Sequence, residues 1–189
     1  MRSEAHEGWL LVVVVVLLVS CDNSDKNNTD DEIVTSVTVD YEVYPFPELI
    51  DCADVIAEVQ IGRVVKEIDT GTPSTILEGE ILDVLKGEPT RRTIQFKQET
   101  QEEIQVNGQS VYNRDDVYVF FFKEAPEDSY DYWIISLDSG AFLATGDVFE
   151  QGTYTYTDLE DLEPSGQSVV ERDVLKSTIA DQVSSKDDE

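Results

Sequence analysis

Residues 117–122 have the sequence Val-Tyr-Val-Phe-Phe-Phe, and this stretch decides the fold class that the sequence predicts. Every side chain in it is apolar or aromatic, so both faces of an extended strand would be apolar. A half-exposed strand alternates apolar and polar side chains, whereas a strand covered on both faces is apolar throughout. The stretch therefore predicts a central strand that is covered on each side.

The segments around this strand alternate with a period of two, which indicates further strands. Val55, Ala57, Val59 and Ile61 fall on one face, and Gly62, which follows them, marks a bulge. Asn107-Gly108 is typical of a two-residue hairpin turn. Several short strands joined by turns predict a mainly β fold, either a closed or partly closed barrel or a sandwich. The remaining predicted strands cover Val37 to Val39, residues 75–85, Ile94 to Phe96, residues 104–106 and 109–112, 132–137 and 141–145.

Two segments have helical signals instead. Pro47 suits the start of a single helical turn over residues 48–53. Near the other end, Ser168-Val169-Val170-Glu171 is a capping-box candidate, which predicts a helix over roughly 169–184 that packs on the barrel. The apolar stripe of that predicted helix consists of Val170, Val174, Leu175, Ile179 and Val183.

The apolar run from Trp9 to Val19 ends in Ser20-Cys21, with Leu18 three positions before the cysteine. Its length falls within the about 7–15 residues of a signal-peptide core and is short of the about 20 that span a bilayer. The arrangement resembles the lipobox of prokaryotic lipoproteins. We expect cleavage after Ser20 and lipidation of Cys21, although the acidic residues before the run are unusual for a signal peptide.

The sequence after Cys21 divides by composition. Residues 22–32 contain no apolar side chain, which predicts a disordered acidic tether that holds the folded part away from the membrane. The predicted organisation is a lipoprotein signal peptide (1–20), an anchor and tether (21–32), a β-barrel domain (33–164), and a C-terminal helix with an acidic tail (165–189).

Charge restricts the partners of the chain. It carries 13 basic and 41 acidic residues, for a net charge of −28. A negative field of this size repels phosphate backbones, so nucleic acid is excluded as an expected partner. Because the acids are spread along the whole length, the pattern fits a surface adapted to high salt or an ordinary acidic extracellular protein.

Histidine and cysteine restrict the chemistry. The one histidine, His6, lies in the predicted signal peptide, so no Ser-His-Asp, Cys-His or histidine–metal site is expected in the processed protein. With Cys21 lipidated, Cys52 has no partner for an internal disulfide. Its apolar surroundings predict a small buried side chain. We expect no catalytic residue of these classes, no cofactor and no metal site.

Three segments together resemble a known family. Ala53-Asp54-Val55-Ile56-Ala57-Glu58-Val59, then Ile81-Leu82-Asp83-Val84-Leu85-Lys86-Gly87-Glu88, then residues 117–122 follow a pattern of exported prokaryotic proteins. The same order is similar to the netrin-like module of tissue inhibitors of metalloproteinases.

This resemblance covers about residues 49–143 and implies an OB-like barrel of five strands. It does not imply protease inhibition, because that mechanism needs a disulfide-tied N-terminal cysteine with a free amino group. In this chain the N-terminal cysteine would be lipidated and would have no disulfide partner. Within the pattern, Gly87 suits a tight turn, and Lys86 is expected to be a solvated turn residue.

Candidate site residues are few. Tyr130, Tyr132 and Trp133 form a possible ligand surface, with core packing as the alternative. Residues 127–131 and 158–163 are acidic loops in which weak calcium binding is the alternative to simple solvation.

The function predicted from these observations is a lipid-anchored binding or interaction module without catalytic activity on the extracytoplasmic face of the cell membrane. Its expected partners are the membrane, through the lipid on Cys21, and a protein or small molecule. The alternatives are a carboxylate-based hydrolase, for which no acidic pair stands out in this sequence, and a calcium-dependent surface adhesion module.

Overall fold

A computed structural model describes residues 35–38, 44–69, 71–106, 111–126, 129–136, 140–151 and 169–186. The chain divides into two units, Met1–Asp31 and Glu32–Glu189, and every described residue lies in the second. The predicted features at Cys21, in the tether, at Asn107-Gly108 and in residues 158–163 lie outside the described residues. No helix in the described part of the chain is both long and apolar enough to cross a membrane.

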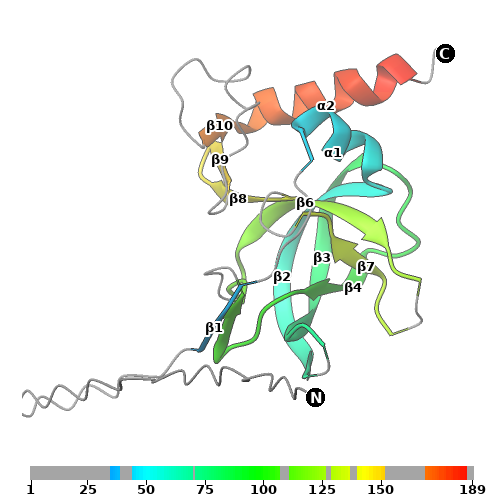
Figure 1. The fold of residues 1–189 in the computed structure, drawn as a ribbon. Coiled ribbons are helices and arrows are strands. Elements are labelled where there is room, and N and C mark those ends of the chain that lie inside the picture. Colours follow the sequence, from blue (N-terminus) through cyan, green and yellow to red (C-terminus); the bar gives the residue numbers. More distant parts are fainter. Residues whose placement is uncertain are drawn as a thin grey trace, which may run out of the picture. The chain divides into compact units, whose positions relative to one another are not determined.

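The described residues form ten strands and two helices (Figure 1). The helices are α1 (Phe46–Cys52) and α2 (Arg172–Lys186). The strands are β1 (Thr35–Val37), β2 (Val55–Ile68), β3 (Ser74–Lys86), β4 (Thr93–Gln98), β5 (Ile104–Val106), β6 (Val117–Glu124), β7 (Tyr132–Ile134), β8 (Ala141–Thr145), β9 (Val148–Gln151) and β10 (Val169–Glu171).

Five of these strands close a barrel in the order β2-β3-β4-β7-β6, since β6 pairs with both β7 and β2. All of these pairings are antiparallel except that between β4 and β7, which is parallel. The strands β8, β9 and β10 extend the sheet beyond β6. The predicted mainly β fold, with an OB-like barrel, a short helix and a C-terminal helix, is therefore confirmed.

The central strand β6 is buried on both faces, as its sequence predicts. Phe120 and Phe122 point into the barrel, where their rings lie 5.1 Å and 5.3 Å from that of Phe96. Val119 and Phe121 point outward into a second apolar cluster. Each fully buried side chain of this size contributes about 1.5–3 kcal/mol, so β6 stabilises two separate cores.

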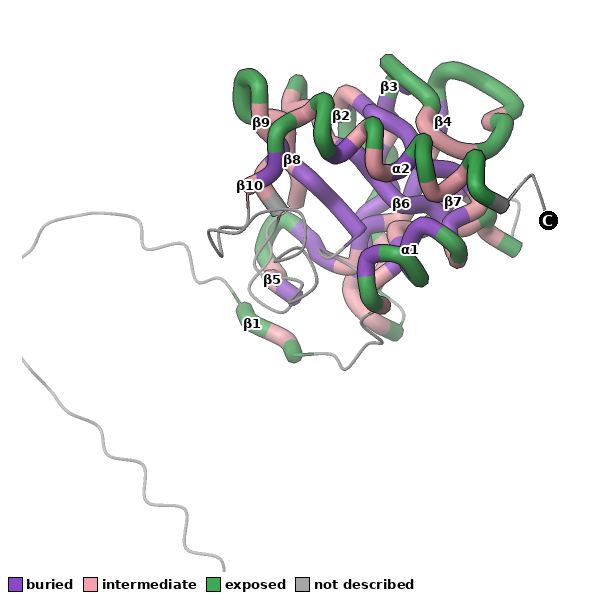
Figure 2. Tube along the Cα trace, turned by 90° about the horizontal axis from the view of Figure 1, so that it is seen from above, coloured by how far each residue is buried: buried purple, intermediate pink, exposed green. Residues whose placement is uncertain are grey.

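The second cluster, which we call the outer layer, lies between the outer face of the barrel and the two helices. Phe46 of α1 packs its ring edgewise against Phe121 and Phe142, at 5.8 Å and 6.1 Å. Leu175 and Ile179 of α2 are fully buried in the same cluster. Figures 1 and 2 show α1 and α2 side by side across one end of the barrel.

The β2–β3 pair is long and irregular. Ile61 is opposite Gly79 and Arg63 is opposite Glu78, so Gly62 is the extra residue of a bulge, as predicted. A Cβ atom at position 62 would lie only 2.8 Å from the carbonyl oxygen of Glu78, which explains why glycine is required there. The bulge follows Gln60, the last residue of β2 that pairs with β6, and beyond it β2 continues its pairing with β3.

The predicted starts of the two helices are corrected. The helix predicted over residues 48–53 begins earlier, at Phe46, with Pro47 in its first turn. Residues 169–171 are extended, because they pair with β9, so the C-terminal helix begins at Arg172. As a result Val170 reaches the core from a strand, and Val174 is 37% exposed rather than part of a buried stripe.

The strand predicted over residues 132–137 stops at Ile134, and Ser136 has a left-handed backbone with φ of 55°. The segment Ile104–Val106 pairs in parallel with Thr35–Val37, a pairing that the sequence did not predict. This pairing is a tertiary contact that the local sequence pattern does not encode.

Candidate functional site

Trp133 lies on the outside of the barrel between two lysines. In register, Trp133 of β7 is opposite Lys97 of β4 on one side and Lys123 of β6 on the other. The preceding residues Phe96 and Tyr132 face the barrel interior. Because side chains alternate along a strand, the three residues point outward together. We call Lys97, Trp133 and Lys123 the Trp133 row; its tryptophan is 42% exposed.

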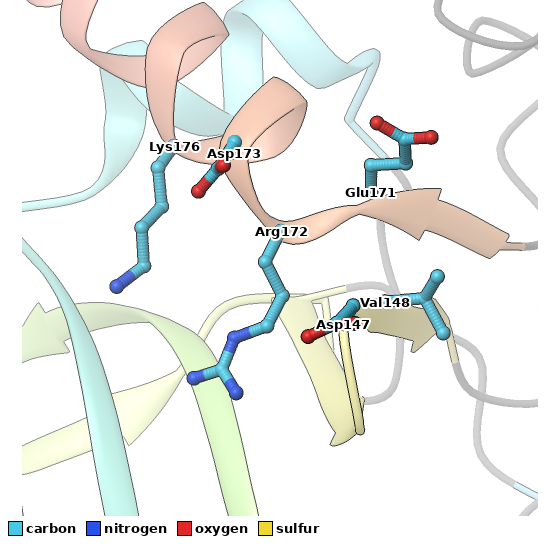
Figure 3. A pocket seen from close by; sticks show the side chains of 6 residues that line it. All are labelled: Asp147, Val148, Glu171, Arg172, Asp173 and Lys176. Carbon is cyan, nitrogen blue, oxygen red and sulfur yellow. The ribbon is translucent and has the colours of Figure 1, made fainter.

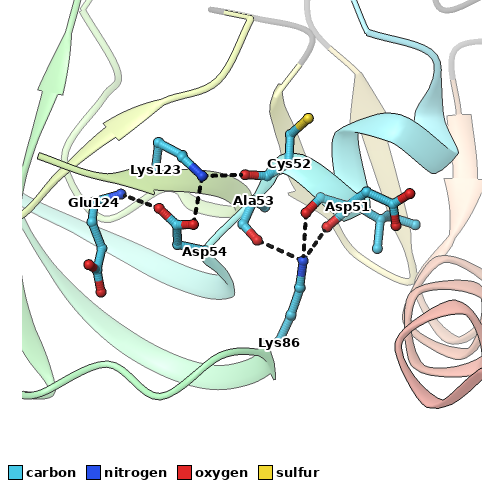
Figure 4. A network of polar contacts seen from close by, with 8 residues as sticks. Asp51, Cys52, Ala53, Asp54, Lys86, Lys123 and Glu124 are labelled. Atoms are coloured by element: carbon cyan, nitrogen blue, oxygen red, sulfur yellow. Dashed lines mark hydrogen bonds and ion pairs between the residues drawn. The ribbon is translucent and has the colours of Figure 1, made fainter. Parts of the chain in front are cut away.

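The Lys123 end of the row is held in a polar network (Figure 4). The Lys123 Nζ atom donates to the Asp54 Oδ1 atom at 2.7 Å and to the carbonyl oxygen of Cys52 at 3.1 Å. The backbone N–H of Glu124 donates to the other Asp54 oxygen at 2.9 Å. Both side chains therefore have fixed positions beside the tryptophan.

Burial raises the pKa of Asp54, but three effects outweigh it. The hydrogen bond from Lys123, the bond from the Glu124 N–H and the positive charges of Lys123 and Lys86 all lower the pKa. The net result is a pKa below the ordinary value of 3.8. Asp54 is consequently an ionised hydrogen-bond acceptor near neutral pH.

The Lys97 end of the row has a similar charge pair. The Lys97 Nζ atom lies 3.4 Å from the Glu99 Oε1 atom, and both side chains are partly exposed. Farther along the same face, Arg91 pairs with Asp131, whose second oxygen accepts the backbone N–H of Gln95 at 2.7 Å. Each positive group beside Trp133 thus has a carboxylate next to it.

Lys86 contacts the end of α1. Its Nζ atom donates to the carbonyl oxygens of Ile50, Asp51 and Ala53, at 2.6, 3.1 and 2.7 Å (Figure 4). The last carbonyls of a helix have no partner within the helix and carry partial negative charge, so a lysine there is stabilising. The prediction that Lys86 is a solvated turn residue is therefore wrong.

Gly87, the next residue, has a positive φ of 80°, as expected of a tight turn. A Cβ atom there would lie 2.2 Å from the carbonyl oxygen of Asp54. The three quoted segments of the sequence pattern therefore meet at one place, the junction between α1 and the barrel. The role of the pattern at this junction is structural.

Glu58 is the buried centre of an ion cluster. It is 4% exposed on β2 and pairs with Arg172 and with Lys176, whose Nζ atom lies 2.6 Å from the Glu58 Oε2 atom. Lys176 also pairs with Asp83 at 2.9 Å. Burial lowers the pKa of Lys176, but its bonds to the two carboxylates outweigh this effect and raise the pKa above its usual value.

Arg172 and Lys176 also line a pocket of about 480 Å³ at the start of α2. Figure 3 shows both side chains reaching from the helix toward the strands. Because Glu58 and Asp83 together match these two positive charges, this pocket does not present a free positive charge to a ligand. The cluster instead attaches α2 to the barrel. The remaining lining residues are Asp147, Val148, Glu171 and Asp173.

The predicted tyrosine and tryptophan surface is only partly correct. Trp133 is exposed and Tyr130 is half-buried, but Tyr132 is 4% exposed and packs against Phe122, with ring centroids 5.3 Å apart. Alternation along β7 puts Tyr132 in the interior. Burial, together with the negative charge of Asp131, raises the pKa of Tyr132 above its usual value.

Other candidate residues have simpler surroundings. Cys52 is half-buried and is not in a disulfide. Asp131, the one acid of the predicted loop 127–131 that the structure describes, is engaged by Arg91. Within the described ranges, no group of three or more histidine, cysteine or acidic residues is arranged to hold a metal ion.

The sequence missed the Glu58 cluster because its members are far apart, with Glu58 and Arg172 separated by 114 positions. It also missed the lysines beside Trp133. Alternation with a period of two in residues 93–97 and 132–134 could have predicted that Lys97 and Trp133 lie on the outer face. It could not have predicted that their strands pair.

No family model matches the chain, and no curated protein matches it.

Proposed function

We propose that the protein is a lipid-anchored binding module on the extracytoplasmic face of the cell membrane, without catalytic activity, and that it binds its partner through the Trp133 row. The observation that carries this proposal is the exposed tryptophan on a closed, rigid barrel. Trp side chains are usually well buried, and exposed ones are enriched at the centres of binding surfaces. Trp133 leaves more than two-fifths of its surface in solvent.

Rigidity supports this proposal. Trp133 projects from a strand that is bonded on both sides, to β4 and to β6. Its inward neighbours, Tyr132 and Ile134, belong to the barrel core. A side chain fixed in this way loses little conformational freedom on binding, which favours affinity.

The proposed location rests on the sequence around Cys21. A lipid on that cysteine would be followed by residues 22–32, a spacer that reaches about 36–40 Å when extended. This length lets the barrel contact partners away from the membrane surface. Cys21→Ser tests the anchor: the variant should leave the membrane fraction or remain unprocessed. A cleaved variant that still sediments with membranes would contradict the anchor.

The binding function is tested with two variants of exposed apolar residues. Trp133→Ala should weaken binding of the full-length protein to immobilised cell-envelope extract by about tenfold or more. Val64→Ala, at a side chain that is 51% exposed on β2 and is not part of the Trp133 row, should leave binding unchanged. Equal affinity of the two variants would refute a role for the row. Thermal unfolding of both variants checks that they are folded.

A further inference from the structure

We infer that the ligand of the Trp133 row is an uncharged saccharide, whose ring stacks on the indole and whose hydroxyl groups bridge the flanking charge pairs. This inference rests on the proposed binding function and names its ligand class. It follows from three properties of the row: the exposed ring, the donors and acceptors on each side of it, and its charge.

The ring provides the first argument. The in-register lysines flank Trp133 on neighbouring strands, so the ring lies within a continuous sheet surface rather than at an end. An indole face carries partial negative charge and is apolar. The C–H bonds of a sugar ring are apolar and directed away from one face of the ring, so they suit this surface.

The charge pairs provide the second argument. On one side of the tryptophan, the ammonium group of Lys123 lies 2.7 Å from the carboxylate of Asp54. On the other side, the ammonium group of Lys97 lies 3.4 Å from the carboxylate of Glu99. All four side chains are partly exposed. A hydroxyl group donates one hydrogen bond and accepts others, so it can bridge an ammonium and a carboxylate. Hydrogen bonds to charged groups are the stronger kind.

The charge of the row provides the third argument. Each lysine of the row is paired with one carboxylate, so the row together with Glu99 and Asp54 has no net charge. The whole chain carries a net charge of −28. A polyanion would be repelled by the chain as a whole. A cation would have to compete with the ammonium groups of Lys97 and Lys123 for the carboxylates of Glu99 and Asp54. An uncharged ligand rich in hydroxyl groups meets neither penalty.

The experiment uses the fluorescence of Trp133. The chain has two tryptophans, and Trp9 lies in the predicted signal peptide, so the full-length Trp9→Phe variant reports on Trp133 alone whether or not that peptide has been removed. Cell-envelope extract of the producing organism is titrated into this variant in three forms: untreated, digested with protease, and oxidised with periodate, which cleaves vicinal diols. We expect a shift in emission that survives protease and is lost after periodate. A fraction of the extract that binds anion exchanger is compared with one that does not, and the unbound fraction should carry the activity.

Other outcomes separate the two proposals. A shift that is lost with protease but survives periodate would overturn the saccharide and keep the binding function. A shift confined to the anionic fraction would overturn the uncharged class. No shift with any form would overturn both. The charge pairs are tested with Lys97→Gln, which should weaken binding at least threefold. The control is Arg114→Gln, at the exposed turn before β6, which should leave binding unchanged. Equal affinities of these two variants would show that the charge pairs do not contribute to binding.

Discussion

The barrel interior and the outer layer are stabilised in different ways, although one strand, β6, contributes to both. The interior is enclosed by strands whose backbones are hydrogen-bonded to each other around a closed circuit. The outer layer is covered by two helices, and side chains such as Glu58 and Lys86 attach these helices to the barrel. The interior therefore depends on apolar volume, whereas the outer layer depends on a few polar contacts as well.

The sharpest test of this difference uses neighbouring residues of β6. Phe120→Ala opens a cavity inside the closed barrel, where the walls relax little, and should lower the free energy of unfolding by about 3–5 kcal/mol. Phe121→Ala opens a cavity beneath α1, which is able to move inward, so the loss should be smaller. Urea unfolding of both variants measures the two values. A larger loss for Phe121→Ala would show that the outer layer is the more rigid region.

The ion cluster should give the next largest effect. Glu58→Gln leaves Arg172 and Lys176 without their buried carboxylate and should lower the free energy of unfolding by about 1.5–3 kcal/mol. Glu78→Gln, which removes the half-buried partner of the exposed Arg63, is the matched control and should change little. Protease sensitivity near residue 172 should rise in the first variant only. Similar stability of the two variants would mean that packing alone attaches α2.

The lysine at the end of α1 should contribute less. Lys86→Met keeps most of the side-chain volume but removes the donor to three helix carbonyls, so we expect a loss of about 1–2 kcal/mol. Lys66→Met, at an exposed position of β2, is the control. Guanidinium unfolding compares the two variants. If Lys86→Met is as stable as its control, water binds the helix carbonyls in place of the ammonium group at no cost in the free energy of unfolding.

The smallest expected effect is a dependence on pH. The pKa of Asp54 is lower in the folded protein than its ordinary value of 3.8, so the unfolded chain binds the proton more readily. The stabilisation is therefore fully present above that value and is lost as the pH falls through the folded pKa. The difference in unfolding free energy between wild type and Asp54→Asn should be larger at about pH 7 than at about pH 3. A constant difference would contradict the lowered pKa.

The fold was largely predictable because its main signals are local. The residues at each position explain three features: the burial of both faces of β6, the bulge at Gly62 and the turn at Gly87. The start of α2 was not predictable, since residues 169–171 suit a helical pattern and become a strand only by pairing with β9.

The candidate site was less predictable for the same reason. Exposure of Trp133 depends on which face of β7 meets the barrel core, and a three-residue strand has too short a pattern to decide this. The lysines beside it come from strands that are distant in sequence, and Lys86 was misjudged because its partners belong to another element.

The Glu58 cluster also sets an order of events during folding. Its two cations lie in α2, the last of the described elements, while its carboxylate lies in β2, the first barrel strand. A growing polypeptide emerges with its N-terminus first. The charge of Glu58 is therefore not matched until Arg172 and Lys176 have been synthesised. Contacts between such distant positions form slowly, because a long loop has to close first. Attachment of α2 to the barrel is therefore a late step, which begins only after Arg172 and Lys176 have been synthesised.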